Sequence, residues 1–548
     1  MPVPAELSQR VLAWVEDDPD PDTRAELTAL HSAAADDDDA LAELTDRLDG
    51  RLEFGTAGLR GEVAAGPNRM NRAVVIQAAA GLATYLQQTG ATGCVVIGYD
   101  ARHKSEVFAT DTAEVMCAAG FDALVLPSPL PTPVLAFAIR HLGCVAGVMV
   151  TASHNPPRDN GYKVYLGDGS QITPPADVEI EAAIGTVGSA ADVAREGEWT
   201  RLSDDIVQAY LDAVAALPDP DSPRALSMVY TPLHGVGGAT VQRALEQAGF
   251  PPPLPVPEQA QPDPDFPTVA FPNPEEPGAI DRATALADQR GADIVVANDP
   301  DADRCAVAVP TMHGWRMLRG DEVGVLLADH LLRRGIGGVF ATTIVSSSLL
   351  GTMAEVSGVD YAETLTGFKW IGRVPGLTFG YEEALGYCVA PSLVKDKDGV
   401  SALLRVAELA AELKSEGRTL LDRLDEIAHQ YGVYATDQLS ARVSDLADID
   451  AAMQRLRTDP PTALGGLAVE QVDDLTEGSP SLPPTDGLRY RLAEGGRVVV
   501  RPSGTEPKIK CYLEVVVPVG DEDVDGARIA AAGRLDAIRG DIATAAGL

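Results

Sequence analysis

The stretch Val148-Met149-Val150-Thr151-Ala152-Ser153-His154-Asn155-Pro156 contains the clearest change from strand to loop in the sequence. Its apolar, β-branched first half is typical of a buried strand, and the residues from Ser153 to Pro156 indicate a tight loop. Such a loop would display the hydroxyl of Ser153 as a candidate nucleophile. Serine and asparagine before proline are also common turn residues, so this stretch alone favours a turn whose side chains only satisfy the backbone.

Helix and strand patterns alternate around this stretch. Before Ser153, helical patterns at 74–88, 105–120 and 133–142 alternate with apolar strand patterns at 94–100 and 123–126. This alternation predicts an α/β domain built on a parallel sheet. Functional loops of such sheets lie at the carboxyl ends of the strands, which is where Ser153 falls.

The same α/β unit recurs along the chain. Further strand patterns follow at 225–230, 293–298 and 339–345, and from about residue 435 the pattern changes to shorter strands and loops. The predicted fold class is therefore α/β, with three related mixed α/β domains followed by a C-terminal α+β domain. We expect the four domains to span 1–205, 206–318, 319–434 and 435–548.

Two further stretches have a clear local pattern. Residues 1–50 are acidic and rich in Ala and Leu, which predicts an N-terminal helical segment whose run Asp36–Asp39 forms a solvated loop. Residues 400–431 have the pattern of a helix.

Charge, hydropathy and cysteine spacing narrow the class of protein. A net charge of -38 argues against nucleic acid and anionic membranes as partners, because both need a basic surface. No apolar run approaches the ~18 to 20 residues of a membrane span, and the N-terminus lacks the features of a signal peptide. The six cysteines are scattered singly, without the spacing of zinc or redox sites. We expect a cytoplasmic protein with reduced cysteines, and the sequence makes no prediction of its oligomeric state.

Three carboxylates at alternate positions, Asp299-x-Asp301-x-Asp303, follow an apolar strand pattern. Carboxylates this close would repel one another, and Mg²⁺, which prefers oxygen ligands, would relieve the repulsion. An acidic surface loop is the alternative, although it would more often follow a polar helix than an apolar strand. A calcium-binding EF-hand is excluded, because Arg304 and Pro310 stand where that loop needs Gly and Glu.

Two stretches, a Gly-rich loop and a loop near the C-terminus, contain cations that could bind an anion. The loop 54–61 ends with Arg60, and the stretch Arg501-Pro502-Ser503-Gly504-Thr505-Glu506-Pro507-Lys508 combines two cations with two hydroxyls and a glycine. The second set of donors suits a phosphate dianion, which a simple connection between two strands would not require. Most loops like the first are only turns.

A third loop, between Gly380 and Gly386, holds the adjacent pair Glu382-Glu383. Carboxylates accept hydrogen bonds from sugar hydroxyls, so this loop is a candidate for sugar recognition. The sequence contains no phosphate loop of the Gly-x-x-x-x-Gly-Lys-Ser/Thr type and no complete dinucleotide fingerprint. The hypothesis of a nucleotide-dependent kinase or dehydrogenase therefore loses its main support.

Taken in chain order, four of these motifs resemble the α-D-phosphohexomutase superfamily, which contains the phosphoglucomutases and phosphomannomutases. The motifs are Thr151-Ala152-Ser153-His154-Asn155-Pro156, Asp299-Pro300-Asp301-Ala302-Asp303-Arg304, Gly380 to Gly386 and Arg501 to Lys508. The resemblance covers essentially the whole chain. It implies four domains around a central cleft, one motif from each, and an intramolecular phosphotransferase.

The resemblance also implies roles for single residues. Ser153 would be phosphorylated in the resting enzyme, and its phosphate would complete a Mg²⁺ site made by Asp299, Asp301 and Asp303. The transfer site would be lined by Arg60, His154 and Lys163. Lys163 and Lys397 are the candidate general bases, and either would need a lowered pKa. The substrate would be bound by Arg304, Lys369, Glu382, Glu383, Arg501, Ser503, Gly504, Thr505 and Lys508.

The function that follows is a phosphosugar mutase that moves a phosphoryl group between the 1- and 6-positions of glucose, and also of mannose. A sugar bisphosphate of the glucose 1,6-bisphosphate type would be both intermediate and activator. Many family members have Ser after the paired Glu, whereas this chain has Ala384, and with Gly367-Phe368-Lys369-Trp370 it is similar to the branch that includes phosphopentomutase. A phosphopentomutase acting on ribose or deoxyribose 1-phosphate is therefore the alternative. A non-catalytic sugar-phosphate-binding protein is a further one, against which the intact Ser153, aspartates and Arg60 argue.

Overall fold

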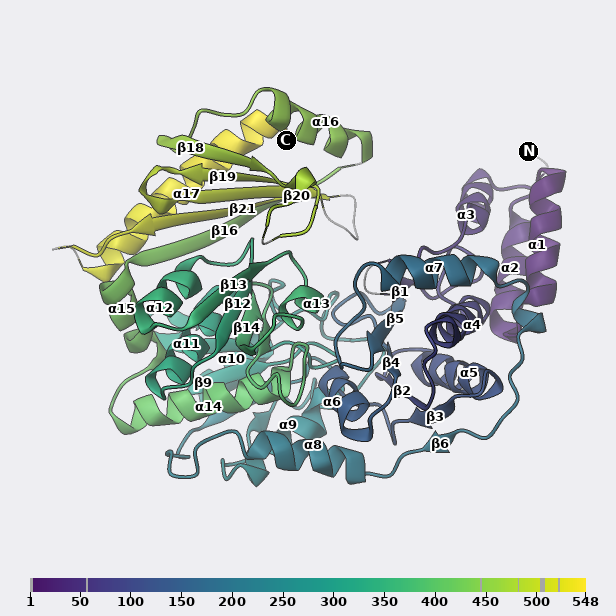
Figure 1. Cartoon of the computed structure of the whole chain (residues 1–548), viewed down its shortest axis with the longest axis horizontal. Helices are drawn as coiled ribbons and strands as arrows, with labels where there is room; N and C mark the ends of the chain where they lie inside the picture. Colours follow the sequence, from purple (N-terminus) through teal and green to yellow (C-terminus); the bar gives the residue numbers. More distant parts are fainter. Residues whose placement is uncertain (1–2, 56–57, 444–445, 481, 503–507, 521–522) are drawn as a thin grey trace. The chain divides into compact units, whose positions relative to one another are not determined.

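A computed structural model describes residues 3–55, 58–443, 446–480, 482–502, 508–520 and 523–548. The chain forms two compact units, one made of residues 1–317 and 386–411 and the other of residues 318–385 and 412–548. Figure 1 labels the helices and strands of both units. None of the helices in the described ranges is long and apolar enough to cross a membrane.

Three helices open the first unit and pack around a small core of their own that includes Leu7, Leu27 and Leu44. They are α1 (Ala5–Asp17), α2 (Pro21–Ala33) and α3 (Asp38–Leu48). The run Asp36–Asp39 is exposed as expected, but a loop forms only at its first two residues, because Asp38 and Asp39 begin α3. Asp37 caps α3 by accepting hydrogen bonds from the N–H groups of Asp39 and Ala40, and acidic residues in a first turn complement the helix dipole.

The first large sheet of this unit has the strand order β1-β5-β4-β2-β3-β6. Strands β4, β2, β3 and β6 are parallel to one another, whereas β5 runs antiparallel to both of its neighbours, β4 and β1. The prediction of a parallel sheet therefore holds for β4 to β6 and fails at the edge formed by β5 and β1. The strands are β1 (Gly58–Glu62), β2 (Cys94–Tyr99), β3 (Asp122–Val125), β4 (Ala146–Val150), β5 (Asp159–Leu166) and β6 (Thr200–Arg201). The helices of this part are α4 (Arg72–Gln88), α5 (Ser105–Ala118), α6 (Thr132–Leu142) and α7 (Ala176–Thr186).

A second sheet, with the order β11-β10-β9-β7-β8, completes the first unit. Its strands are β7 (Met228–Thr231), β8 (Leu254–Pro255), β9 (Ile294–Ala297), β10 (Ala306–Thr311) and β11 (Gly314–Met317). Its helices are α8 (Asp205–Ala215), α9 (Gly237–Gln247) and α10 (Asp281–Arg290). The serine loop follows the carboxyl end of β4, and the loop of the three aspartates follows that of β9.

A returning segment, residues 386–411, adds strand β15 (Gly386–Cys388) and most of helix α14 (Gly399–Ser415) to the first unit. The N-terminus of α14 lies against the aspartate loop so closely that a Cβ on Gly399 would be 2.2 Å from the carbonyl oxygen of Arg304. Only glycine fits such an approach. The expected single helix at 400–431 is two helices, α14 and α15 (Leu420–Tyr431), and Gly417 between them has a φ of +73°.

The second unit combines a three-layer part with a C-terminal sheet. Its parallel strands follow the order β13-β12-β14, and its C-terminal sheet is antiparallel with the order β16-β21-β20-β19-β18-β17. The first part contains α11 (Gly320–Arg333), β12 (Val339–Thr343), α12 (Leu349–Ser357), β13 (Asp360–Thr364), α13 (Phe368–Ile371), β14 (Leu377–Glu382) and α15. The second contains β16 (Val433–Arg442), α16 (Leu446–Thr458), β17 (Ala463–Leu464), β18 (Leu467–Asp474), β19 (Leu488–Leu492), β20 (Arg497–Pro502), β21 (Lys508–Val517) and α17 (Val524–Ala546).

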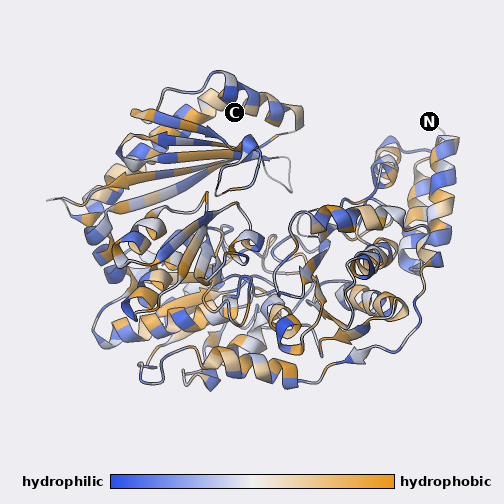
Figure 2. Cartoon of the chain, in the orientation of Figure 1, coloured by the Kyte–Doolittle hydropathy of each residue, from blue (hydrophilic) through white to orange (hydrophobic). Residues whose placement is uncertain are grey.

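Hydropathy explains how the C-terminal sheet packs. Figure 2 shows hydrophobic and hydrophilic residues together on its strands, as expected for an antiparallel sheet with one covered face. Val498, Val500 and Tyr490 belong to a core cluster to which Leu456 of α16 and Ile538 of α17 also belong, so these helices cover that face. The predicted fold class, three mixed α/β domains and a C-terminal α+β domain, is confirmed, whereas the exact boundaries stay predictions.

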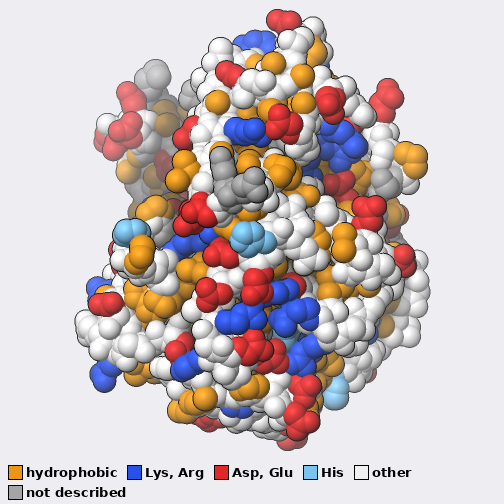
Figure 3. Space-filling view, turned by 90° about the vertical axis from the view of Figure 1, so that its left-hand side faces the viewer, with side chains coloured by type: hydrophobic (Ala, Val, Ile, Leu, Met, Phe, Trp, Pro, Cys, Tyr) orange, Lys and Arg blue, Asp and Glu red, His pale blue; other side chains and the backbone are white. Residues whose placement is uncertain are grey.

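The charged surface is mixed. Figure 3 shows Lys and Arg side chains interspersed with Asp and Glu side chains on one face. In the second unit, for example, Arg423 lies 2.5 Å from a carboxylate oxygen of Glu426. Pairs of this kind at the surface contribute little to stability.

Candidate active site

Ser153 lies in the loop between β4 and β5 and is 2% exposed. Its backbone has a φ of +51°, in the left-handed region that non-glycine residues rarely occupy. Its N–H donates to Oγ1 of Thr151 at 2.9 Å, and its Oγ donates to Oδ2 of Asp299 at 2.6 Å. A strained residue of this kind persists where its surroundings over-determine it, which is common at functional sites.

The aspartate loop is completely buried. Oδ1 of Asp299 accepts from the N–H of Arg304 at 3.0 Å, which bends the loop back on itself. Oδ2 of Asp301 accepts from the hydroxyl of Thr132 at 2.6 Å and from Nζ of Lys163 at 2.7 Å. Nζ of Lys163 also donates to Oδ2 of Asp303 at 3.0 Å. The loop after β9 is therefore bonded to residues of α6 and β5, two elements that belong to the part of the unit built on the first sheet.

The three carboxylates could hold a metal ion. One oxygen from each lies within 4.8 Å of the others. Oδ1 of Asp301 and Oδ1 of Asp303 are buried and accept no hydrogen bond from the described residues. A buried oxygen atom without a hydrogen-bond donor destabilises the fold unless a cation takes the place of the donor. Three carboxylate oxygen atoms are suitable ligands for Mg²⁺.

Electrostatics within the triad agree with a cation site. Burial, together with the charges of Asp301 and Asp303, raises the pKa of Asp299 well above its ordinary value. Burial also acts to raise the pKa of Asp301, but Lys163 and the hydrogen bonds to this carboxylate outweigh it and hold that pKa well below its usual range. One carboxylate thus resists ionisation while its neighbour is fully ionised, and an additional positive charge would allow both to ionise.

Lys163 and Lys397 both lie beside this loop. Nζ of Lys397 is 3.4 Å from Oδ2 of Asp303, and Nζ of Lys163 is closer, at 3.0 Å. Burial acts to lower the pKa of Lys163, but Asp301 and Asp303 outweigh it and raise that pKa. Lys163 is therefore held as a cation in this arrangement, without the lowered pKa that a general base would need.

Arg60 and His154 flank the serine. Nη1 of Arg60 donates to Oδ1 of Asn155 at 3.2 Å, and Nδ1 of His154 is 3.2 Å from Oγ of Ser153. Burial, with the nearby charges of Arg304 and Arg60, lowers the pKa of His154 well below its ordinary value, so the imidazole is neutral. The carboxylate of Asp299 bonds the serine itself and not the imidazole, which differs from a Ser-His-Asp hydrolase.

The second unit holds the glutamate pair. Glu382 ends β14 and is buried, and Oε2 of Glu383 accepts from the hydroxyl of Ser346 at 2.9 Å. A Cβ on Gly320 would be 1.9 Å from the carbonyl oxygen of Glu383, so the glutamate loop lies directly against the start of α11. Burial, and then Asp321, raises the pKa of Glu383.

Apart from Arg304, the other expected substrate contacts also belong to the second unit. Nζ of Lys369 is 5.7 Å from the centre of the Trp370 ring. Arg501 lies near the end of β20 and Lys508 begins β21, whereas Ser503, Gly504 and Thr505 lie outside the described residues. Burial and the charge of Glu383 raise the pKa of Tyr512 on β21, while Arg501 lowers it, so the glutamate pair and Arg501 act on one side chain.

The structure thus groups the expected residues in two sets. Ser153, the triad, Arg304, Lys163, Lys397, His154 and Arg60 gather in the first unit, and Lys369, Glu382, Glu383, Arg501 and Lys508 belong to the second. Sequence reasoning missed Thr132, Arg102 and Ser346. Arg102 follows the carboxyl end of β2, so the rule that placed Ser153 at a strand end could have found it. The contact of Thr132 depends on a fold that no local pattern reveals.

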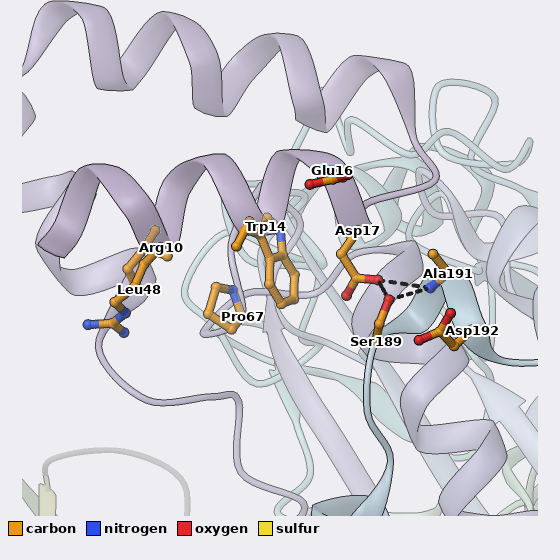
Figure 4. A pocket seen from close by; sticks show the side chains of 10 residues that line it. Arg10, Trp14, Glu16, Asp17, Leu48, Pro67, Ser189, Ala191 and Asp192 are labelled. Carbon is orange, nitrogen blue, oxygen red and sulfur yellow. Dashed lines mark hydrogen bonds between the residues drawn. The ribbon is translucent and has the colours of Figure 1, made fainter.

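A separate hollow of about 600 Å³ lies between the N-terminal helices and the segment 189–192. Figure 4 shows Trp14, Asp17 and Ser189 around it, with Asp17 bonded to Ser189 and to the N–H of Ala191. None of the expected site residues lines this hollow. The residues around this hollow connect the N-terminal helices to the part of the unit built on the first sheet.

Asp321, at the start of α11, should make the stability of the fold depend on pH. Burial raises its pKa to about 6, although it accepts hydrogen bonds from the N–H of Ser347 and the hydroxyl of Thr436. Because the folded protein holds this proton more tightly than the unfolded chain, the protonated carboxyl stabilises the fold at low pH. This contribution, on the order of 2 to 3 kcal/mol, is fully present below the ordinary pKa of 3.8 and is lost as the pH rises from there through about 6.

Asp321→Asn, which stays neutral, should therefore be less destabilised than wild type when the pH rises from 5 to 7. The thermal unfolding midpoint, measured across this range, checks it. Asp360→Asn, at an exposed acidic residue of the same unit, serves as the control and should follow wild type. Parallel curves for wild type and Asp321→Asn would contradict the prediction.

Comparisons with known proteins identify the family to which the chain is similar. Models of the phosphoglucomutase/phosphomannomutase family match four successive stretches: α/β/α domain I at 51–190, domain II at 208–314, domain III at 319–431 and the C-terminal domain at 439–529. A probable phosphomannomutase of Haemophilus influenzae is 48% identical over 454 residues, which cover 81% of this chain and 93% of that protein. A probable phosphoribomutase of Schizosaccharomyces pombe is 39% identical over 558 residues, covering 92% and 93%.

A solved structure has the same fold. The crystal structure of a putative phosphomannomutase from Thermus thermophilus superposes with a TM-score of 0.71 at 26% identity, covering 89% of this chain and 100% of that one. The chain therefore belongs to the phosphoglucomutase/phosphomannomutase family, within the α-D-phosphohexomutase superfamily of intramolecular phosphotransferases.

Proposed function

We propose that the protein is a Mg²⁺-dependent phosphosugar mutase that moves a phosphoryl group between the 1- and 6-positions of glucose, and of mannose, through phospho-Ser153. The observation that carries the proposal is the buried bond from Oγ of Ser153 to Asp299, beside two carboxylates that each keep one oxygen without a donor. This arrangement places a hydroxyl next to a cation site, which is what phosphoryl transfer from a serine requires.

Asp299, Asp301 and Asp303 would hold the metal ion. When bound, Mg²⁺ neutralises negative charge on the phosphoryl group that is transferred. Arg60, Arg304 and Lys163 add fixed positive charges around Ser153, and their burial strengthens this effect. His154, which is neutral, can contact the phosphoryl group without adding charge to the site.

The proposed chemistry moves one phosphoryl group in each half of the cycle. The bond from phosphorus to Oγ of Ser153 breaks as a bond from phosphorus to a sugar oxygen forms, and the sugar hydroxyl's proton passes to the neutral amine of Lys397, because Asp301 and Asp303 hold the other candidate, Lys163, as a cation. The resulting sugar bisphosphate turns over, and its other phosphoryl group returns to Oγ. The same lysine then returns its proton to the sugar oxygen, so that protons and phosphoryl groups balance over a cycle.

The second unit would bind the sugar and its other phosphate. Glu382 and Glu383 can accept hydrogen bonds from sugar hydroxyls, and Lys369 supplies a cation. The donors of the stretch from Arg501 to Lys508 suit the phosphate that does not react. A sugar bisphosphate of the glucose 1,6-bisphosphate type would restore the phosphate of Ser153 whenever it is lost, and would therefore act as an activator.

A pentose substrate is the second candidate. It is favoured by Ala384, which removes a hydroxyl from the glutamate loop, and by the name of the Schizosaccharomyces pombe relative, a probable phosphoribomutase. A sugar loop with fewer polar contacts discriminates less strongly between sugars. The higher identity to a probable phosphomannomutase favours the hexose.

Incubation with glucose 1,6-bisphosphate should add one phosphate to the wild-type chain, as measured by intact mass, and none to Ser153→Ala. Ser203→Ala is the matched control, because the hydroxyl of Ser203 also donates to an aspartate, at 2.8 Å, but at an exposed helix start. This variant should take up phosphate like wild type. If wild type never gains a phosphate, the mutase proposal fails and a binding protein becomes the better explanation.

Mg²⁺ should raise the thermal unfolding midpoint of the wild type, because it relieves repulsion among three buried carboxylates. Asp301→Asn should lose most of this shift, and EDTA should abolish turnover until Mg²⁺ is added back. Asp396→Asn provides the control, because Asp396 is equally buried but bonds to Tyr165 and Gln171 instead. An equal Mg²⁺ shift in Asp301→Asn would show that the ion binds elsewhere.

A panel of glucose, mannose and ribose 1-phosphates should give the highest kcat/KM with glucose. Ala384→Ser, which restores a hydroxyl to the loop, should increase the ratio of hexose to pentose turnover by a few fold. A preference of tenfold or more for ribose 1-phosphate in wild type would replace the hexose by the pentose as substrate and leave the reaction type unchanged.

A further inference from the structure

Arg102 binds the backbone of the serine loop at four points. Its side chain is 1% exposed and lies just beyond the carboxyl end of β2. Nη2 donates to the carbonyl oxygens of Ser153 at 2.7 Å and Asn155 at 2.6 Å. Nη1 donates to those of Pro156 at 2.7 Å and Asp159 at 3.1 Å. One guanidinium group therefore holds the whole turn from β4 to β5.

Arg102 is itself held on two sides. Oδ2 of Asp100 is 3.4 Å from its Nε, and Oδ1 of Asp100 accepts from its backbone N–H at 3.0 Å. The ring of Phe266 lies under the guanidinium, 4.9 Å from its central carbon. A charged pair and a cation–π contact thus fix the orientation of the planar group before it reaches the loop.

The carboxylate of Asp100 is also linked to Ser153 through the hydroxyl of Thr151. Oδ2 of Asp100 accepts from the hydroxyl of Thr151 at 2.6 Å, and Oγ1 of Thr151 in turn accepts from the N–H of Ser153. The N–H and the carbonyl oxygen of Ser153 are therefore both bound by groups that depend on Asp100. Few other conformations of this residue could keep both contacts.

This double attachment explains the unusual backbone of Ser153. A φ of +51° costs energy, and the residue would relax toward a common conformation if its surroundings did not hold it. Relaxation would move Oγ away from Asp299, with which it makes a 2.6 Å bond. Misplacing a reacting atom by about 1 Å can cost about 100-fold in rate.

We propose that Arg102 is a positioning residue for phosphoryl transfer, which holds Ser153 in the conformation that directs Oγ toward the aspartate loop. The inference rests on the proposed mutase function. Arg102 acts through carbonyl oxygens and not through contact with the sugar, so its loss should lower kcat and leave KM for the sugar phosphate nearly unchanged. Lysine keeps the charge but not the planar fork of donors, so it cannot replace this geometry.

Arg224 offers a matched control in the same unit. It donates to the carbonyl oxygens of Ala248 at 2.8 Å, Ser222 at 2.7 Å and Asp219 at 2.7 Å. Its guanidinium lies 4.8 Å from the centre of the Phe250 ring. Arg224 thus repeats the structural features of Arg102 at the amino end of β7, where none of the expected site residues occurs.

The experiment compares Arg102→Lys and Arg224→Lys with wild type. We measure kcat and KM for glucose 1-phosphate, the rate of phosphate uptake from glucose 1,6-bisphosphate and the thermal unfolding midpoint. Arg102→Lys should lose about 100-fold in kcat and in phosphate uptake with KM changed less than threefold. Arg224→Lys should keep both rates, whatever its unfolding midpoint. Wild-type kcat in Arg102→Lys, or an equal loss of kcat in the two variants, would overturn the inference.

Two further variants keep the test decisive if Arg102→Lys does not fold. Arg102→Ala should recover part of its kcat when millimolar guanidinium ion is added, and Arg224→Ala should not respond. Phe266→Leu, which removes only the ring beneath the guanidinium, should lower kcat by less than Arg102→Lys and leave KM unchanged. An unchanged kcat in Phe266→Leu, with no recovery of Arg102→Ala by guanidinium, would also overturn the inference.

Failure of this inference is separable from failure of the proposed function. If wild type takes up phosphate at Ser153 and Arg102→Lys does so equally fast, the serine is the carrier but Arg102 does not position it. If wild type takes up no phosphate, the mutase function itself fails, and the inference fails with it.

Discussion

Repulsion among three buried carboxylates is the constraint on which the rest of the first unit depends. Asp299, Asp301 and Asp303 follow one strand, and no fold could bury them without matching donors. Lys163 from β5 and Thr132 from α6 supply part of this compensation, and the hydroxyl of Ser153 supplies another part. The elements that carry these donors must therefore meet at the end of β9, and the serine is brought to the site by the same requirement.

Much of this arrangement could be predicted from the sequence, because the signals are local. A run of apolar residues that breaks into a polar loop identifies both the Ser153 loop and the aspartate loop, and the alternation of helix and strand patterns predicts the α/β layers. Strand direction was harder. Residues 159–166 include Asp159, Asn160 and Lys163 and give no apolar strand pattern, yet they form β5, which is buried along most of its length and runs antiparallel to β4.

Other features depend on contacts between distant residues. Arg102 and Ser153 are far apart in sequence, and only the pairing of β2 with β4 brings their loops together. The acidic run at Asp36–Asp39 predicts a solvated loop, because charge indicates exposure. Exposure does not exclude a helix, and a helix start attracts acidic residues. The break between α14 and α15 was missed because a single glycine, Gly417, interrupts an otherwise helical pattern.

Arg102 contacts the serine loop only through main-chain oxygen atoms, and this has a consequence for how the loop can vary. Carbonyl oxygens are the same whatever side chain a residue carries, so the hydrogen bonds from Arg102 do not restrict the side chains of residues 154–156. Those side chains remain available to the reaction, as the contact between Asn155 and Arg60 illustrates. Shape and chemistry are thus encoded separately in the loop. Its path is specified by an arginine that follows another strand, β2, and its own side chains can vary without altering that path.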